Sequence, residues 1–163
     1  MNLRTGIGFD AHRYAGDQRP LHLALLTWPG QIGLEGHSDG DVVAHALVDA
    51  IAQAGQLGDI GALFGKADPN FAGANSRVFL QGVTNRLHQA GYQLVHAAVQ
   101  LIGNAPVLAP RRAQAQVALS EAVGAPVSLA ATTTDSLGFA GRGEGLAAIA
   151  TCLAKARDTT REG

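Results

Sequence analysis

The sequence predicts an α+β fold, mainly one β-sheet with helices packed on one face. Patterns typical of strands and of helices follow one another along the 163 residues, without the glycine fingerprint of dinucleotide-binding βαβ units. The chain contains no internal repeat, linker or low-complexity tract, and its length suits one domain rather than two. We therefore expect residues 1–163 to form a single domain.

The first predicted strand covers residues 3–12. Ile7 and Phe9 fall on one of its sides, while Gly6 and Gly8 allow close packing on the other. Alternation of this kind indicates a strand that has one packed face.

A polar turn is expected next, over residues 13–20. Residues 21–28 then predict a second strand, and Pro29 and Gly30 should end it because both residues favour turns.

The clearest helix follows the polar stretch around Gly40. Ser38 or Asp39 can cap its first turn, and it should fade at Gly55. Its apolar face has helical spacing and consists of Val42, Val43, Ala46, Leu47, Ala50 and Ile51.

Two more helices are predicted from their end signals. Ser76 can cap one that stops at Gly91, and Pro110 suits the first turn of another that ends near Gly124. These two helices should cover the same face of the sheet as the first.

The remaining segments are strands and loops. Residues 58–73 are dense in Gly, Asp, Pro and Asn and predict a loop, whereas residues 92–102 and 127–134 read as strands. Residues 138–145 are rich in glycine. Residues 146–156 are ambiguous, because their alanines favour helix while the sheet needs one more strand.

Charge and composition exclude several classes of function. The formal net charge is -1 and no basic stripe is visible, so we expect no nucleic-acid partner. No apolar run is long enough to span a bilayer, and the N-terminus lacks the apolar core of a signal peptide. The single cysteine, Cys152, suits a reducing compartment. These features predict a cytoplasmic protein without a membrane partner.

Asp10, His12 and His45 form the first candidate site. Asp10 and His12 are two residues apart, so in a strand both side chains leave the same face. One carboxylate and two imidazoles suit Zn²⁺, with a fourth position left open for substrate. Asp49 lies one turn after His45 and could orient its ring through the second nitrogen. Taken alone, the same residues also occur as a strand end and a polar-face histidine.

Two further segments could hold an anion. Residues 37–41 form a loop that enters a helix N-terminus, where backbone N–H groups attract phosphate. Residues 132–135 carry three threonines and Asp135 before the glycine-rich segment, and hydroxyls beside a carboxylate can hold phosphate and Mg²⁺. Taken alone, the first segment can also be a plain capping sequence, and a threonine run such as the second is more often just a strand of high β-propensity.

Six motifs in order are more specific than any of them alone. They are GFDAH, HSDGDVVAHAL, GDIGALF, DPNF, ATTTDSLGF and GRGEG, from about Gly6 to beyond Gly145. In this order they resemble the signatures of the 2-C-methyl-D-erythritol 2,4-cyclodiphosphate synthase family. The resemblance implies a cytoplasmic homotrimer whose sheets line a central core and whose active sites lie between subunits.

The resemblance also implies an activity. The enzyme would be a phosphorus–oxygen lyase of the non-mevalonate isoprenoid pathway. Its substrate, 4-diphosphocytidyl-2-C-methyl-D-erythritol 2-phosphate, would give 2-C-methyl-D-erythritol 2,4-cyclodiphosphate and CMP. The 2-phosphate would attack the β-phosphorus within one molecule, which needs alignment more than a general base.

Site residues follow from the positions that match the family's motifs. The zinc ligands would be Asp10, His12 and His45, and Asp135 would help to hold Mg²⁺ or Mn²⁺. The residues that stabilise the transition state would be His37 and Thr133. Contacts with the substrate would come from Ser38, Asp59, Ile60, Gly61, Asp68, Gly103, Ala105, Pro106, Val107, Leu108, Ala109, Thr132, Thr134, Phe139 and Arg142.

Four positions depart from the family pattern. Asp135 stands where Glu is common, and Val107 stands where a lysine often lies near the nucleotide. Lys66 replaces an acidic residue, and Leu25-Leu26 replaces a glycine pair of the second strand. These changes bear on affinity for the substrate rather than on the reaction.

Two other functions are compatible with the same residues. One is a metal-dependent phosphohydrolase with water as nucleophile, which would need a base aligned on that water. The other is a non-catalytic trimer in which Phe9, Arg142 and Glu144 hold an isoprenoid diphosphate in a central cavity. A purely structural zinc would have four protein ligands, and the sequence offers three.

Overall fold

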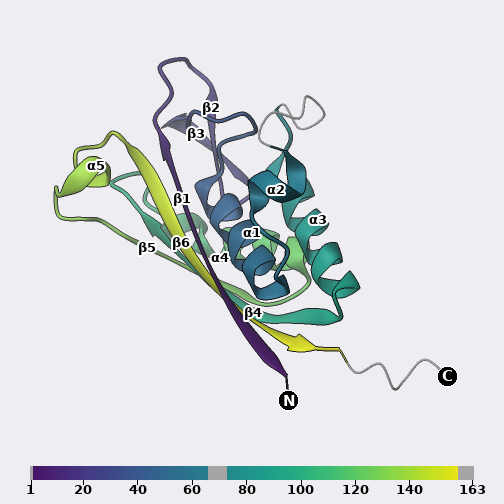
Figure 1. Ribbon diagram of the computed structural model, residues 1–163. Coiled ribbons are helices and arrows are strands. Elements are labelled where there is room, and N and C mark those ends of the chain that lie inside the picture. Colours follow the sequence, from purple (N-terminus) through teal and green to yellow (C-terminus); the bar gives the residue numbers. More distant parts are fainter. Residues whose placement is uncertain (1, 66–72, 158–163) are drawn as a thin grey trace.

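The main sheet of the computed structural model contains four strands, and the structure describes residues 2–65 and 73–157. The strand order is β1-β6-β4-β5 (Figure 1). The strands are β1 (Leu3–Arg13), β6 (Gly145–Ala156), β4 (Tyr92–Ile102) and β5 (Val127–Thr132). β6 pairs antiparallel with both β1 and β4, whereas β4 and β5 are parallel. The sheet is therefore mixed, and the ambiguous last segment is a strand.

Helices cover one face of this sheet, as the α+β prediction requires (Figure 1). They are α1 (Val42–Gly55), α3 (Ser76–Gln89) and α4 (Arg112–Val123), which the 3₁₀ turn η2 (Ala109–Arg111) precedes. Gly6 and Gly8 bring β1 directly against α1, because a Cβ at either position would lie about 2.0 Å or less from the carbonyl oxygen of Ala50 or Ala46. The two predicted packing glycines are confirmed.

The opposite face of the sheet carries no helix among the described residues. Apolar side chains stand exposed there on β1 and β6: Ile7 is 57% exposed, Phe9 58% and Ile149 38%. Apolar residues gathered in this way normally lie against another surface.

The second predicted strand is wrong, because residues 20–32 form a hairpin. β2 (Pro20–Leu23) pairs with β3 (Leu26–Ile32), and Pro29 and Gly30 lie inside β3 instead of ending it. The turn places Ala24 and Leu25 at φ 54° and 63°. Only glycine adopts this region without strain, so the leucine at position 25 has a cost that a glycine would avoid.

Both predicted helix caps are displaced. Asp41, rather than Ser38 or Asp39, caps α1 by accepting hydrogen bonds from the backbone N–H groups of residues 43 and 44. Asn75, rather than Ser76, caps α3. Asp39 instead accepts hydrogen bonds from the backbone N–H and hydroxyl of Ser76, which ties the two helix starts together.

Smaller differences lie near the loops. The segment predicted as a loop over residues 58–73 contains the short helix α2 (Ile60–Phe64), and its residues 66–72 lie outside the described residues. The strand predicted to reach residue 134 ends at Thr132, and α5 (Gly138–Gly141) follows it. None of the helices in the described part of the chain is long and apolar enough to cross a membrane.

Candidate active site and metal centre

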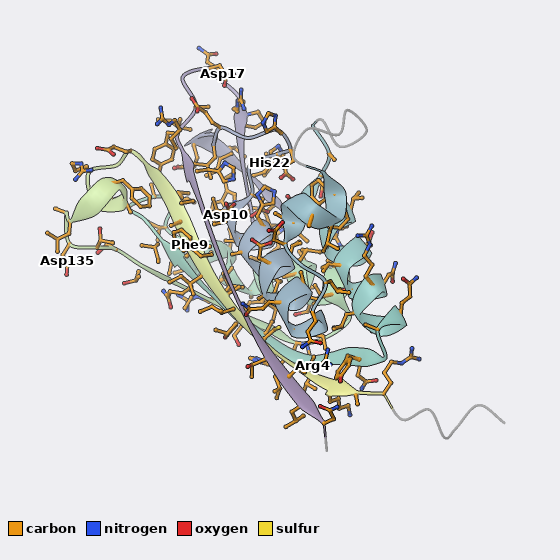
Figure 2. The ribbon with its side chains drawn as sticks, in the orientation of Figure 1. Arg4, Phe9, Asp10, Asp17, His22 and Asp135 are labelled. Atoms are coloured by element: carbon orange, nitrogen blue, oxygen red, sulfur yellow. The ribbon has the colours of Figure 1, made fainter. Side chains whose placement is uncertain are left out.

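Asp10, His12 and His45 come together between β1 and α1. Oδ2 of Asp10 lies 3.0 Å from Nε2 of His12 and 3.0 Å from Nδ1 of His45. One ligand atom from each residue lies within 4.8 Å of the others. Figure 2 shows Asp10 beside α1 and Phe9 on the other side of the sheet. The alternation of β1 therefore separates a polar cluster from the uncovered apolar face.

Asp10 and His12 stabilise each other's charged form. Burial raises the pKa of Asp10, but hydrogen bonds from His12 and His45 outweigh it and lower that pKa to about 2. The hydrogen bond with Asp10 raises the pKa of His12 above 6.5. An ionised carboxylate beside two imidazoles is a strong set of metal donors.

Each histidine is held by its outer ring nitrogen. Nδ1 of His12 donates to the backbone carbonyl oxygen of Glu35, and Nε2 of His45 lies 3.0 Å from Oγ of Ser38. The remaining nitrogens, Nε2 of His12 and Nδ1 of His45, both face Asp10, and each can bind a cation in place of the proton that it shares with this carboxylate. The donor set and its outer contacts fit a Zn²⁺ ion.

Asp49 does not orient His45 as expected. Oδ1 of Asp49 accepts a hydrogen bond of 2.8 Å from the backbone N–H of Ile60, and Ser38 contacts the ring nitrogen assigned to Asp49. Burial raises the pKa of Asp49. This carboxylate therefore anchors the start of α2 rather than the metal cluster.

The loop before α1 is not a free anion site at the helix end. The buried carboxylate of Asp41 already accepts hydrogen bonds from the N–H groups of Val43 and Ala44, so at the helix end itself the capping alternative applies. His37 in the same loop is exposed and lines a cavity of about 470 Å³ with Glu35 and other residues of the polar turn.

α2 brings part of the predicted substrate site next to the metal cluster. Asp59 caps it by accepting a hydrogen bond of 2.8 Å from the N–H of Ala62, and Ile60 and Gly61 form its first turn. The hydrogen bond from Ile60 to Asp49 ties the start of α2 to α1, at a residue that lies one helical turn after His45. Asp68 and Lys66 lie outside the described residues.

The segment predicted to line a nucleotide pocket joins β4 to α4. Tyr14 donates its hydroxyl to the carbonyl oxygen of Ala105, at 3.3 Å. Pro106 and Leu108 are buried, while Val107 is 71% exposed. Gly103 and Ala109 bound the segment, and the N–H of Gly103 donates to the carbonyl oxygen of Thr132.

Arg111 holds this segment and was missed by the sequence analysis. Its Nη1 donates to the carbonyl oxygen of Thr27 at 2.6 Å, and its guanidinium stacks over the Trp28 ring at 4.8 Å. Both partners lie on β3, which the sequence alone did not place beside α4. Nothing in the sequence pattern around Arg111 marks this contact.

The predicted phosphate segment is well ordered by its own contacts. Thr133 donates its hydroxyl to Asp135 at 3.3 Å, and Thr134 donates its hydroxyl to the carbonyl oxygen of Leu137 at 2.6 Å. Thr132, Thr133 and Asp135 are exposed. The side chains of this turn are therefore accessible to a ligand.

This segment does not reach the metal cluster within one chain. Two strands separate β5 from β1, so about 14 Å lies between them. The pairing puts Thr132 in register, through Ile102 and Ala147, with Ala11 rather than Asp10 or His12. Thr132 thus belongs to the uncovered face, and Figure 2 shows Asp135 far from Asp10.

Phe139 and Arg142 lie close to the uncovered face as well. Phe139 and Glu144 line a cavity of about 660 Å³ together with Tyr14 and with Ala11, His12 and Arg13 of β1. Nε of Arg142 donates to Glu144 at 2.6 Å. This cavity is distinct from the one beside His37.

Similarity to known proteins agrees with the motifs. The model of the YgbB family matches residues 3–155. A "2-C-methyl-D-erythritol 2,4-cyclodiphosphate synthase" of Cutibacterium acnes is 51% identical over 154 residues, which are 94% of this chain and 91% of that protein. The "Bifunctional enzyme IspD/IspF" of Clavibacter michiganensis subsp. michiganensis is 56% identical over 151 residues, 93% of this chain. The chain spans 37% of the length of that bifunctional relative.

A solved structure is similar to this chain in both fold and sequence. The structure entitled "Structure of 2C-Methyl-D-erythritol-2,4-cyclodiphosphate Synthase (bound form CDP)" superposes with a TM-score of 0.84 and 35% identity, and covers 93% of this chain and 100% of that one. Together with the family match over nearly the whole sequence, this shows that the chain belongs to the YgbB family of 2-C-methyl-D-erythritol 2,4-cyclodiphosphate synthases.

Proposed function

We propose that the chain converts 4-diphosphocytidyl-2-C-methyl-D-erythritol 2-phosphate into 2-C-methyl-D-erythritol 2,4-cyclodiphosphate and CMP. It would act as a phosphorus–oxygen lyase of the non-mevalonate isoprenoid pathway. The observation that carries the proposal is the convergence of Asp10, His12 and His45, with both histidines already turned toward one point. The relative from Cutibacterium acnes is named as a synthase of the same cyclodiphosphate.

Residues of this chain, together with residues 132–135 of a neighbouring copy, would align the reacting groups. An oxygen of the 2-phosphate attacks the β-phosphorus, the bond from this phosphorus to the bridging oxygen breaks, and CMP leaves with that oxygen. His37 and Thr133 would donate hydrogen bonds to the phosphoryl oxygens, and Ser38 and the first turn of α2 would hold the methylerythritol part. Because both reacting groups belong to one molecule, alignment alone supplies a large rate gain.

Zn²⁺ is the cofactor that the cluster fits best. Asp10, His12 and His45 would hold it, and it would supply positive charge against the phosphate oxygens. Three protein ligands leave a position for the substrate, which favours a catalytic site over a purely structural one.

Asp135 is the proposed residue for Mg²⁺ or Mn²⁺. Its exposed carboxylate sits beside the hydroxyl of Thr133, and Mg²⁺ commonly binds through one or two carboxylates together with substrate phosphates. The ion would neutralise charge on the α- and β-phosphates, of which only the α-phosphate leaves, as part of CMP.

We further propose that residues 1–163 form one catalytic domain that works as a cytoplasmic homotrimer. The exposed apolar face of the sheet supports this assembly, since three such faces would bury one another. The distance between β5 and β1 supports it too, because a neighbouring subunit could bring its residues 132–135 to the metal cluster. The central cavity that the three subunits would enclose, near Phe9, Arg142 and Glu144, would then accept an isoprenoid diphosphate.

One reaction tests the proposed activity. Phosphorus NMR of the protein with the cytidylylated substrate, Zn²⁺ and Mg²⁺ should show a ring-closed diphosphate and CMP. Asp135→Ala should lower kcat strongly while the zinc content stays constant, and Asp135→Glu should keep activity because a carboxylate remains. An open-chain diphosphate or free phosphate as main product would mean that water is the nucleophile and that the enzyme is a hydrolase.

A further inference from the structure

The short helix α2 cannot hold its position by itself. It contains five residues, Ile60–Phe64, and an isolated helix of this length is not stable in water. It nevertheless carries Ile60 and Gly61 of the proposed substrate site directly after Asp59. Its place relative to the metal cluster must therefore come from contacts with the rest of the fold.

Each end of α2 is fixed by a charged side chain from a different helix. At the first turn, Asp49 of α1 accepts the N–H of Ile60 at 2.8 Å. At the last turn, Nη1 of Arg86 of α3 donates to the carbonyl oxygen of Leu63 at 3.0 Å. This carbonyl oxygen is one of those that a helix end leaves without an intrahelical partner.

Arg86 also packs on the side chain that anchors α2 in the core. Its guanidinium lies over the Phe64 ring, 5.2 Å from the centroid. The Phe64 ring packs edge-on against Phe79 of α3 at 5.1 Å, and Phe79 packs edge-on against His45 at 6.2 Å. A row of rings thus connects α2 to a residue of the metal cluster.

α3 is shaped to receive this ring. A Cβ at Gly82 would lie 2.9 Å from the Phe64 ring, so any other residue there would require this ring to shift. Arg86 follows Gly82 by four residues and lies on the same side of α3. The glycine admits the ring and the arginine covers it.

We propose that Arg86 is a positioning residue for the substrate, acting through α2 to hold Asp59, Ile60 and Gly61 at the metal cluster. This inference rests on the proposed function, because it assigns Arg86 to the site of that reaction. Arg86 itself does not touch the reacting atoms. The planar guanidinium matters because it donates a hydrogen bond and stacks at the same time, which an ammonium group does less well.

Three variants test the role of Arg86. Arg86→Met removes the donor and keeps the length of the side chain, Arg86→Lys keeps a charge and a donor, and Arg77→Met on the same helix is the control. The side chain of Arg77 has no hydrogen bond or ion pair among the described residues. Metal-loaded protein is used throughout, and 2-C-methyl-D-erythritol 2,4-cyclodiphosphate is the probe.

Calorimetry should give Arg86→Met an affinity for the cyclodiphosphate about 5- to 10-fold weaker than wild type, the effect of about one hydrogen bond and its packing. KM should rise by a similar factor, with kcat within about twofold and the zinc content unchanged. Amide hydrogen exchange at residues 60–64 should accelerate, while α1 stays protected. Arg86→Lys should recover part of the affinity, and Arg77→Met should match wild type.

The outcomes separate the two claims. If wild type neither binds the cyclodiphosphate nor forms it, the proposed function fails. If wild type binds it and Arg86→Met binds it equally well, with unchanged exchange at residues 60–64, the role of Arg86 is refuted. Loss of zinc or a fall confined to kcat would also refute it. Should Arg86→Met not fold, Arg86→Lys decides by the same two measurements.

Discussion

Replacing Asp41 with asparagine removes one acceptor oxygen from a site that water does not reach. The side chain is fully buried, and Oδ1 accepts hydrogen bonds from the N–H groups of Ala24, Val43 and Ala44. Oδ2 accepts a hydrogen bond of 2.7 Å from the N–H of Leu25. One carboxylate therefore caps α1 and also holds the hairpin turn between β2 and β3.

The expected loss of stability follows from these four contacts. Asp41→Asn can keep the three bonds to one oxygen, but its amide group then faces the N–H of Leu25, which should cost about 2 kcal/mol. Asp41→Ala removes the cap, about 1 kcal/mol, and leaves the N–H groups of the turn unpaired, for about 3–5 kcal/mol in total.

Thermal unfolding at equal protein concentration measures both variants. Asp41→Asn should lower Tm by about 4–8 °C and Asp41→Ala by about 10 °C or more. Asp17→Asn is the control, because Asp17 is exposed and its partner Arg19 is on the surface. If Asp41→Asn melts with wild type, the carboxylate does not join the turn to the helix, and the reasoning is refuted.

The remaining predictions concern the metal cluster and the nucleotide segment. Ser38→Ala should weaken zinc binding about 10-fold, because Ser38 holds the outer nitrogen of His45, and chelator competition measures the change. An unchanged affinity would show that the ring needs no such support. Since Asp10 raises the pKa of His12, zinc binding should begin to weaken at a pH above 6.5 as the pH falls, which the same titration checks at several pH values. The metal-free protein should become less stable as the pH rises, because the stability that protonated His12 contributes is present at low pH and is lost as the pH rises through the folded-state pKa of His12. Zinc binding that weakens only below pH 6.5 would contradict the pairing of His12 with Asp10. Arg111→Met should lower the affinity for CDP about fivefold in calorimetry, and an equal affinity would exclude a role in shaping the segment.

Helix α1 was predictable from its periodic apolar face, α3 and α4 from their end signals, and three strands of the sheet from their strand patterns, whereas β6 stayed ambiguous because its alanines favour helix. β4 matches the predicted residues 92–102, and the glycines at positions 6 and 8 correctly indicated a close approach. The hairpin was not predictable, because neither alanine nor leucine, the residue types at positions 24 and 25, favours turns. The turn depends on the buried carboxylate of Asp41, which is 16 or more residues away.

The metal cluster was predictable for a similar reason. Asp10 and His12 share a strand face and His45 sits on the next clear helix, so only one contact between elements had to be guessed. The partners of those residues were not predictable. Ser38 and Asp49 are both near His45 in sequence, and only the path of the loop decides which of them reaches its ring. Arg86 and Arg111 belong to no sequence motif. Each contacts an element that is distant in sequence and that only the tertiary structure brings close.

The place of β6 in the sheet has a consequence for the order of folding. β6 is the last strand in sequence, yet it lies between β1 and β4 and is the sheet neighbour of β1 in the described part of the chain. During synthesis, residues 3–13 must wait for residues 145–156 before their backbone can pair, and such distant pairing is slow. The helix that carries His45 can form early, but the side chains of Asp10 and His12 are fixed in direction only after β6 has paired with β1. A nascent chain that ends before residue 145 should therefore bind zinc poorly, and full affinity should appear only after β6 has been made.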